Sequence, residues 1–140
     1  MRKINVIIKR PGEKPHSTWI IDTIENLQKN VEGYIKTFAT YIETVIIGTG
    51  ADPCYETLVI ICNEEGRIKG LPYNCTVGRI NFVGTIIVAG IKDDEFADIP
   101  CTFGTFKRLF PQLFDIEENS VSVDCDEEVE KSFSFRIKKD

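Results

Sequence analysis

The sequence predicts an α+β fold made mainly of antiparallel or mixed β-sheet. Ile occurs 20 times and Val 10 times, whereas Leu occurs only five times. Side chains branched at Cβ favour pleated strands and are slightly disfavoured in helices. Short apolar runs bounded by turn residues recur along the chain, and one segment, about 23–32, has the spacing of a well-defined helix. We therefore expect a single sheet-rich domain over residues 1–140.

Composition limits the class of protein. The chain has 140 residues, a formal net charge of −5 and 42% hydrophobic residues, which suffices for one core without disulfides or metal. No apolar run approaches the roughly 20 residues of a membrane span, and the first ten residues lack a signal-peptide core. The cysteines number five, and an odd number argues against a disulfide framework. No two of them form a C-x-x-C pair, which argues against a zinc site. We expect a cytoplasmic protein without membrane contact or cofactor.

The first part of the chain predicts two strands followed by the helix. Residues 3–9 form the first strand, and residues 17–21 form the second after a turn rich in Pro and Gly. Asp22 followed by Glu25 fits a capping box at the start of the helix. Gly33 supplies a left-handed residue at the end of the helix. Helical spacing turns three apolar residues toward the sheet, namely Ile24, Leu27 and Val31.

The rest of the chain predicts further strands and one short helix. Residues 34–47 predict two strands or one long bent strand, and residues 57–62 form an apolar run typical of a central strand. The hairpin-like turn at 63–66 leads into a short returning strand at 67–70. The other expected elements are a loop at 48–53, a loop at 71–74, a buried strand at 84–91, an acidic loop at 92–95, a short helix within 105–114 that Pro111 interrupts, and a C-terminal strand pair at 121–123 and 132–137.

Three blocks follow one another in a distinctive order: the helix exit 31–35, the segment 61–74, and the apolar strand 84–90 with the acidic residues after it. The middle block joins an apolar strand, an acidic turn and a Gly-Leu-Pro-x-Asn loop. In order and content, these blocks resemble the phage- and mobile-element-associated family catalogued as domain of unknown function 3846. The resemblance covers roughly residues 1–100 and leaves 101–140 as an acidic C-terminal extension. It implies a small accessory protein of a phage, plasmid or conjugative element.

The loop Leu71-Pro72-Tyr73-Asn74 is the first candidate for a ligand-binding surface. Pro72 stiffens it, Tyr73 offers a face for stacking, and Asn74 offers a paired donor and acceptor. Asn63, in the acidic turn of the same block, joins the candidate ligand-binding residues. A purine-like ring or a peptide could use this surface. The alternative is a structural turn in which Tyr73 packs against the edge of the core.

The residues suited to nucleophilic or acid–base catalysis are few. His16 is the single histidine, and it lies in a Pro-flanked segment without a neighbouring acid, so a surface role is expected. Cys75, directly after the Leu-Pro-Tyr-Asn loop, is the best-placed thiol for a nucleophile. A buried free cysteine that packs as a small hydrophobe is the commoner case. Gly48-Thr49-Gly50 lacks the Gly-Lys-Ser/Thr ending of a phosphate-binding loop and is expected to be a turn.

Two pairs of carboxylates could together bind a divalent cation. Glu64 and Glu65 follow one apolar strand, and Asp93 and Asp94 follow another, so the two pairs could meet at one edge of the sheet. Mg²⁺ requires one or two carboxylates plus water or phosphate. The alternative is that both pairs are solvated turns. This metal site is the basis of the enzymatic alternative considered below.

Charge is distributed unevenly along the chain. Residues 115–130 carry eight acidic and no basic residues, which fits either a surface that mimics nucleic acid or a solvated segment. No basic stripe with interleaved aromatics is present, so direct nucleic-acid binding is not expected. Strands rich in Ile and Val leave pairing between two copies open, without fixing register or copy number.

Two classes of function remain. The first is a non-enzymatic accessory protein of a mobile element that binds a host protein or a small ligand, with an anti-defence role as one example. It depends on the family resemblance, the small catalytic inventory and the loop at 71–74. The alternative is a metal-assisted hydrolase or nucleotide-processing enzyme that uses Glu64, Glu65, Asp93 and Asp94.

Overall fold

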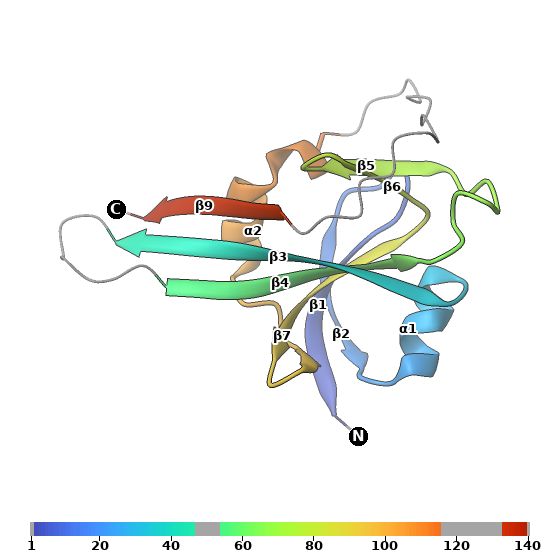
Figure 1. Ribbon diagram of the computed structural model, residues 1–140, viewed down its shortest axis with the longest axis horizontal. Coiled ribbons are helices and arrows are strands. Elements are labelled where there is room, and N and C mark those ends of the chain that lie inside the picture. The colour runs from blue at the N-terminus through green and yellow to red at the C-terminus, as the bar shows by residue number, and fades with distance from the viewer. Residues whose placement is uncertain (1, 47–53, 116–132, 140) are drawn as a thin grey trace.

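The computed structural model describes residues 2–46, 54–115 and 133–139 and shows the expected α+β fold (Figure 1). Its main sheet has the strand order β2-β1-β7-β4-β3-β9, with β8 paired to β7. Neighbouring strands are antiparallel except β9, which runs parallel to β3. The strands of this sheet are β1 (Lys3–Lys9), β2 (His16–Ile21), β3 (Ile35–Ile46), β4 (Cys54–Asn63), β7 (Ile86–Lys92), β8 (Glu95–Ala97) and β9 (Phe133–Lys139).

Different elements cover the two faces of the sheet. Helix α1 (Ile24–Val31) packs on one face. The other face is covered by α2 (Phe103–Leu109), the 3₁₀ turn η1 (Pro111–Leu113) and a small hairpin of β5 (Tyr73–Val77) and β6 (Ile80–Val83). Figure 1 shows α1 and α2 on either side of β1 and β7. Among the described residues, no helix is long and apolar enough to cross a membrane.

The alternation of strand side chains explains the two cores. In β4, Leu58, Ile60 and Cys62 face the hairpin, whereas Val59 and Ile61 face α1. β4 and β7 lie in the middle of the sheet, so both of their faces are apolar. This confirms the central strand that the run at 57–62 predicts, and 34–47 forms one long strand over its described residues.

Helix α1 lies where the sequence predicts it, but both of its ends differ. The N-cap is Thr23, whose side chain accepts from the Asn26 N–H at 3.2 Å. Asp22 precedes the cap, and its N–H continues the β1–β2 ladder by donating to the Arg2 carbonyl at 3.0 Å. At the C-terminus the left-handed residue is Glu32 (φ 62°) rather than Gly33.

The inward face of α1 is also narrower than expected. Leu27 and Val31 are fully buried against the sheet, whereas Ile24 is 50% exposed. Ile24 is the first residue of the helix, so it lies at the margin of the buried face.

The segment between β4 and β7 is where the sequence-based expectations were wrong. Residues 67–70 do not return as a strand, because 64–70 form consecutive turns held by hydrogen bonds such as Lys69 N–H to the Glu65 carbonyl at 2.9 Å. The expected loop at 71–74 is half strand, since Tyr73 and Asn74 begin β5. The β5–β6 hairpin, which Gly78 (φ 62°) and Arg79 connect, was not predicted.

The C-terminal expectations were met in part. Asp93 and Asp94 have positive φ and form a two-residue turn that joins β7 to the short strand β8, in place of an open acidic loop. The helix expected within 105–114 begins earlier, at Phe103, and Pro111 starts a separate 3₁₀ turn. Strand β9 is present beside β3. Residues 48–53 and the expected partner strand at 121–123 lie outside the described residues.

Candidate functional site

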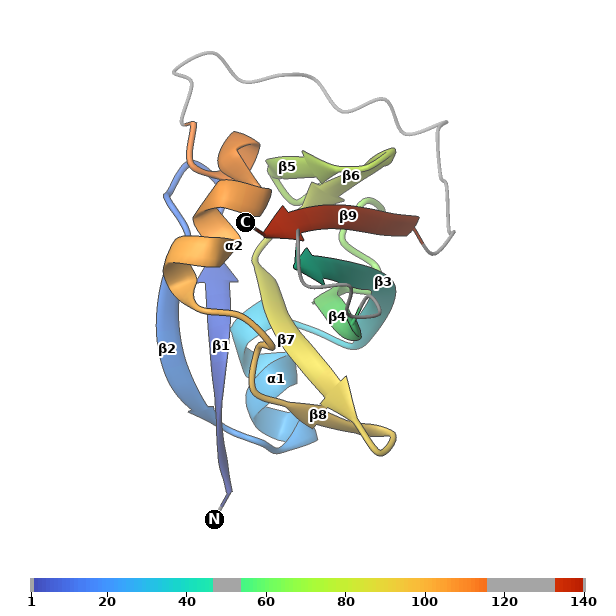
Figure 2. The same ribbon diagram turned by 90° about the vertical axis from the view of Figure 1, so that its left-hand side faces the viewer.

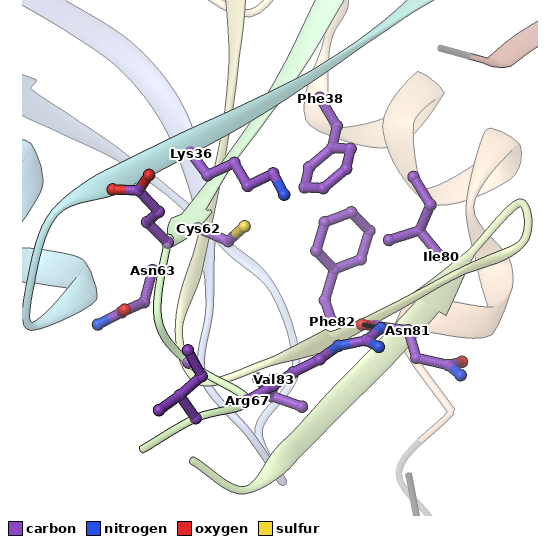
Figure 3. Close-up of a pocket in the computed structure, with 12 residues that line it drawn as sticks. Lys36, Phe38, Cys62, Asn63, Arg67, Ile80, Asn81, Phe82 and Val83 are labelled. Atoms are coloured by element: carbon purple, nitrogen blue, oxygen red, sulfur yellow. Dashed lines mark hydrogen bonds between the residues drawn. The ribbon is translucent and has the colours of Figure 1, made fainter. Parts of the chain in front are cut away.

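A pocket opens between the main sheet and the β5–β6 hairpin, at the end of the sheet where β4 stops. It has a volume of about 90 Å³. Its walls come from β3, the end of β4, the 64–70 turns and β6, as Figure 3 shows. The residues that line it are Lys36, Phe38, Cys62, Asn63, Glu64, Gly66, Arg67, Ile68, Ile80, Asn81, Phe82 and Val83.

Two aromatic rings form the apolar wall of the pocket. Phe38 on β3 and Phe82 on β6 meet edge to face, with ring centroids 5.4 Å apart and planes at 88°. Phe82 is almost fully buried, whereas Phe38 is partly buried. Ile80 continues this wall along β6 (Figure 3). The pairing of hairpin and sheet therefore creates an aromatic wall inside the pocket.

Two cationic side chains from different elements line the same pocket. The Lys36 ammonium lies 5.4 Å from the centroid of the Phe38 ring. Arg67, in the turn after β4, donates from Nη2 to the Asn81 carbonyl at 3.0 Å, which fixes its guanidinium against β6. Glu64 is the one acidic residue in the lining, so two positive charges and one negative charge leave the pocket with a net charge of +1. A concave site of this kind favours an anionic ligand.

The thiol in the pocket is poorly suited to nucleophilic chemistry. Burial raises the pKa of Cys62 to about 11, although the nearby Lys36 and Arg67 charges lower it in part. Cys75 lies in the same apolar cluster, and burial raises its pKa to about 12. Both side chains are therefore protonated thiols at neutral pH, and a thiol is a weak nucleophile.

Asn63 holds the rim of the pocket in place. Its Nδ2 donates to the carbonyls of Val31 and Glu32 at 3.0 and 3.1 Å, and its Oδ1 accepts from the Glu65 N–H at 2.8 Å. One buried amide thus joins the end of α1 to the turn after β4. Gly33 permits this approach, because a Cβ there would lie 2.7 Å from the Asn63 Nδ2.

Asn74 has a similar structural position at the base of the hairpin. Its Nδ2 donates to the carbonyls of Lys9 and Gly84 at 2.8 and 2.7 Å. Its Oδ1 accepts from the Lys9 ammonium at 2.7 Å. Lys9 is only 3% exposed, and burial lowers its pKa. This buried polar pair ties β5 to β1 and so fixes the hairpin on the sheet.

The rest of the predicted ligand loop is engaged with the hairpin as well. The Tyr73 hydroxyl forms a hydrogen bond of 2.6 Å with Thr76 Oγ1. Leu71 packs against Gly84, where an added Cβ would meet its Cδ1 at 2.8 Å. Pro72 is exposed. Of the ligand-binding residues that the sequence predicts, only Asn63 lines the pocket, and a site at Leu71–Asn74 stays a prediction.

The structure does not bring the two pairs of carboxylates together. Glu64 and Glu65 follow the end of β4, and Asp93 and Asp94 follow the end of β7. Because β4 and β7 are antiparallel, the two turns lie at opposite ends of the strands, roughly 30 Å apart. Across residues 2–46, 54–115 and 133–139, no group of three or more His, Cys, Asp or Glu could hold a metal ion. His16 is exposed at the start of β2.

Most of the pocket was missed from the sequence. Lys36 and Arg67 are far apart in the chain and meet only because β3 pairs with β4 and the following turn folds back. Phe38 and Phe82 meet only through the unpredicted hairpin. The one available signal was local: Gly78-Arg79 between two short apolar runs is typical of a two-residue hairpin turn.

Comparison with known proteins identifies a family and nothing more specific. A family model described as Domain of unknown function (DUF3846) matches residues 1–110. That segment contains every residue that lines the pocket, together with Lys9 and Asn74. No curated protein and no solved structure matches the chain.

Proposed function

The chain belongs to the DUF3846 family, and from that premise we propose that it is a non-enzymatic accessory protein that binds a small anionic ligand in the pocket between β3 and β6. The observation that carries the proposal is the joint lining of this pocket by Lys36, Arg67 and the Phe38–Phe82 wall. The ligand class that fits is a molecule with one anionic group and one flat apolar group.

Size and charge favour this class over others. A volume of about 90 Å³ holds a small ring or an anionic group rather than a whole drug-sized ligand, since such sites occupy roughly 300–1,000 Å³. Burying an anion requires compensation, which Lys36 and the anchored Arg67 guanidinium supply. The Phe38 and Phe82 rings supply the apolar contact. Two cations in one pocket do not make the extended basic surface that nucleic-acid binding requires.

The non-enzymatic part of the proposal is supported by the chemistry of the pocket. Its thiol is protonated at neutral pH, and the carboxylates of the metal-dependent alternative belong to opposite edges of the sheet. The family resemblance supports the biological setting: an accessory protein of a phage or mobile element that acts in the cytoplasm of its host. There, an anionic signalling molecule of the host is a suitable ligand, which would make the role one of anti-defence.

Thermal shift with matched probe pairs tests the proposal. Benzoate and phenyl phosphate combine an anionic group with a flat ring, and benzamide and phenol keep the ring without the charge. We expect the anionic member of at least one pair to raise the melting temperature of the wild type more than its neutral counterpart. If neither anion raises it, the ligand proposal is wrong and a protein partner is favoured.

Charge-matched variants then locate the site. Lys36→Gln removes one cation of the pocket, and Lys92→Gln removes an exposed lysine at the opposite edge of the sheet with the same change in net charge. We expect the anion-induced shift to be lost in Lys36→Gln and retained in Lys92→Gln. Loss of the shift in Tyr73→Ala, with retention in Lys36→Gln, would instead place the ligand at the 71–74 segment. A shift with Mg²⁺ that Asp93→Asn abolishes would revive the metal-dependent alternative.

A further inference from the structure

Strand β2 is an outer strand of the main sheet, and its edge lacks the usual protection against pairing. Figure 2 shows β2 as the outermost strand on its side. It pairs with β1 at six consecutive positions without a bulge. Its sequence, His16-Ser17-Thr18-Trp19-Ile20-Ile21, contains no Pro, Lys, Arg, Asp or Glu. Proteins ordinarily protect an edge strand with such residues or with a bulge, because an unpaired strand edge is a template for another strand.

The other outer strands differ in this respect. β9 contains Arg136, Lys138 and Lys139, and like charges oppose the pairing of two copies. β8 has only three residues and begins with Glu95. Among the described outer strands of the main sheet, the uncharged, regular edge is therefore specific to β2.

The hydrogen-bond pattern shows which backbone groups of β2 point outward. Asp22 N–H donates to the Arg2 carbonyl at 3.0 Å, so this opposed pair is a hydrogen-bonded one. In an antiparallel ladder, hydrogen-bonded pairs alternate with pairs that are not hydrogen-bonded. Three positions further on, the pair of Trp19 and Asn5 is therefore one that is not hydrogen-bonded. Asn5 confirms this, because its N–H and carbonyl bond to Asp98 and Ile99 on the side away from β2. The backbone groups of Ser17, Trp19 and Ile21 accordingly point outward.

Trp19 adds a side chain that is suited to an interface. Its side chain is 60% exposed in the single chain. Trp is among the residues most enriched at the centres of protein interfaces. Among the described residues, no element pairs with the outer edge of β2. The same strand thus combines an unpaired backbone edge with an exposed aromatic anchor.

We propose that β2 pairs antiparallel with β2 of a second copy, on a two-fold axis that passes between the two Trp19 residues. This register uses all three outward residues: Trp19 bonds reciprocally with Trp19 of the second copy, and each Ile21 N–H donates to the Ser17 carbonyl of the other chain. The Ile21 carbonyl already accepts from the Thr23 N–H at 2.9 Å, so four hydrogen bonds form the ladder. The two indoles become cross-strand neighbours on one face. The two sheets then join into one, and the pocket between β3 and β6 has no part in the contact.

Light scattering coupled to size-exclusion chromatography tests the dimer. The interface is small, so we expect a concentration-dependent mass that rises toward twice 15.9 kDa at high micromolar concentration. Trp19→Lys places two like charges on the axis and is expected to give the monomer mass. Tyr34→Lys is the matched control, because Tyr34 is also an exposed aromatic residue, at 65%, and lies outside β2; it is expected to dimerise as the wild type does. A wild type that stays monomeric, or a dimer that survives Trp19→Lys, would overturn the proposal.

Cross-linking tests the register and does not depend on how well Trp19→Lys folds. Opposed residues of a hydrogen-bonded antiparallel pair have Cα atoms about 5.5 Å apart, within the range of about 4.4–6.8 Å that a disulfide spans. We expect Trp19→Cys to form a covalent dimer in oxidised glutathione, and Tyr34→Cys to form none above the wild-type background. Equal cross-linking of the two variants would contradict the predicted axis.

Discussion

The two faces of the central sheet are closed in different ways. On the α1 face, ten buried apolar residues meet, two of them, Leu27 and Val31, from the helix itself, and the buried Asn63 amide bonds to the end of the helix. On the opposite face, the apolar cluster is larger and includes Cys62 and Cys75. There the hairpin is attached to the sheet through the buried pair Lys9 and Asn74, and the pocket opens beside it.

The α1 face serves stability, whereas the hairpin face also leaves room for a ligand. A helix with an apolar stripe covers its face of the sheet evenly, which leaves little space for a ligand. A short hairpin tied down by a few polar contacts covers its face unevenly and leaves a concave end. We therefore expect apolar substitutions on the α1 face to alter stability alone, whereas removal of a pocket charge, as in Lys36→Gln, should alter binding with little effect on stability.

The largest expected effect is on the α1 face. Leu27→Ala removes a fully buried side chain and leaves a cavity, so the free energy of unfolding should fall by about 2–5 kcal/mol. Urea unfolding measures this change. Ile24→Ala in the same helix is the control, because Ile24 is 50% exposed and its loss should cost under about 1 kcal/mol. Equal effects of the two variants would contradict the described face of α1.

The attachment of the hairpin to the sheet should show the next-largest effect. Asn74→Ala removes the side-chain partner of the carbonyls of Lys9 and Gly84 and the shortest bond of the Lys9 ammonium, which keeps only longer bonds of 3.4 and 3.5 Å to backbone carbonyls. The free energy of unfolding should fall by about 2–3 kcal/mol, and benzoate binding should weaken because the hairpin forms one wall of the pocket. Asn30→Ala, which removes one part-buried bond within α1, should leave probe binding unchanged. Intact probe binding in Asn74→Ala would show that the hairpin does not shape the site.

The buried thiols on the hairpin face make the free energy of unfolding depend on pH. Cys75 has a pKa of about 12 in the folded protein against 9.0 when unperturbed, so between these values the folded state holds more protons than the unfolded state. Stability should therefore fall as pH rises above 9.0, by about 1.4 kcal/mol per unit for one such thiol. Cys62 acts in the same direction, whereas the lowered pKa of Lys9 acts in the opposite one.

Cys75→Ala isolates the contribution of its thiol. Urea midpoints measured from pH 8 to 10 should decline less steeply in this variant than in the wild type, whatever its stability at neutral pH. Parallel declines would show that the Cys75 thiol is not shielded from water as described.

Local patterns predicted the fold well and the pocket poorly, for a physical reason. The strand at 3–9 agrees with β1 because alternating apolar residues and the Pro-Gly turn act within a few positions. The helix begins one residue later than the local pattern predicts: Asp22 pairs with Arg2 at the end of the β1–β2 ladder, and Thr23 is the N-cap. The pocket depends on contacts between distant segments, and no local signal reports that Lys36 and Arg67 share a cavity.

The predicted ligand residues show the same limit. The sequence predicts ligand-binding roles for Asn63 and Asn74, the latter because its amide offers a donor and an acceptor. In the fold those groups bond to the backbones of α1, β1 and the 64–70 turns instead. Polar residues in a turn can therefore identify a structurally important segment without identifying its ligand.

Backbone NMR with an anionic probe locates the ligand on the protein. We would titrate benzoate, and benzamide as its neutral counterpart, into isotopically labelled protein and follow the amide resonances. We expect benzoate shifts to concentrate at Lys36, Arg67 and Phe82, with weaker shifts for benzamide at the same residues. Benzoate shifts that are absent, or that concentrate at Pro72 and Tyr73 or along α1, would contradict the proposed site.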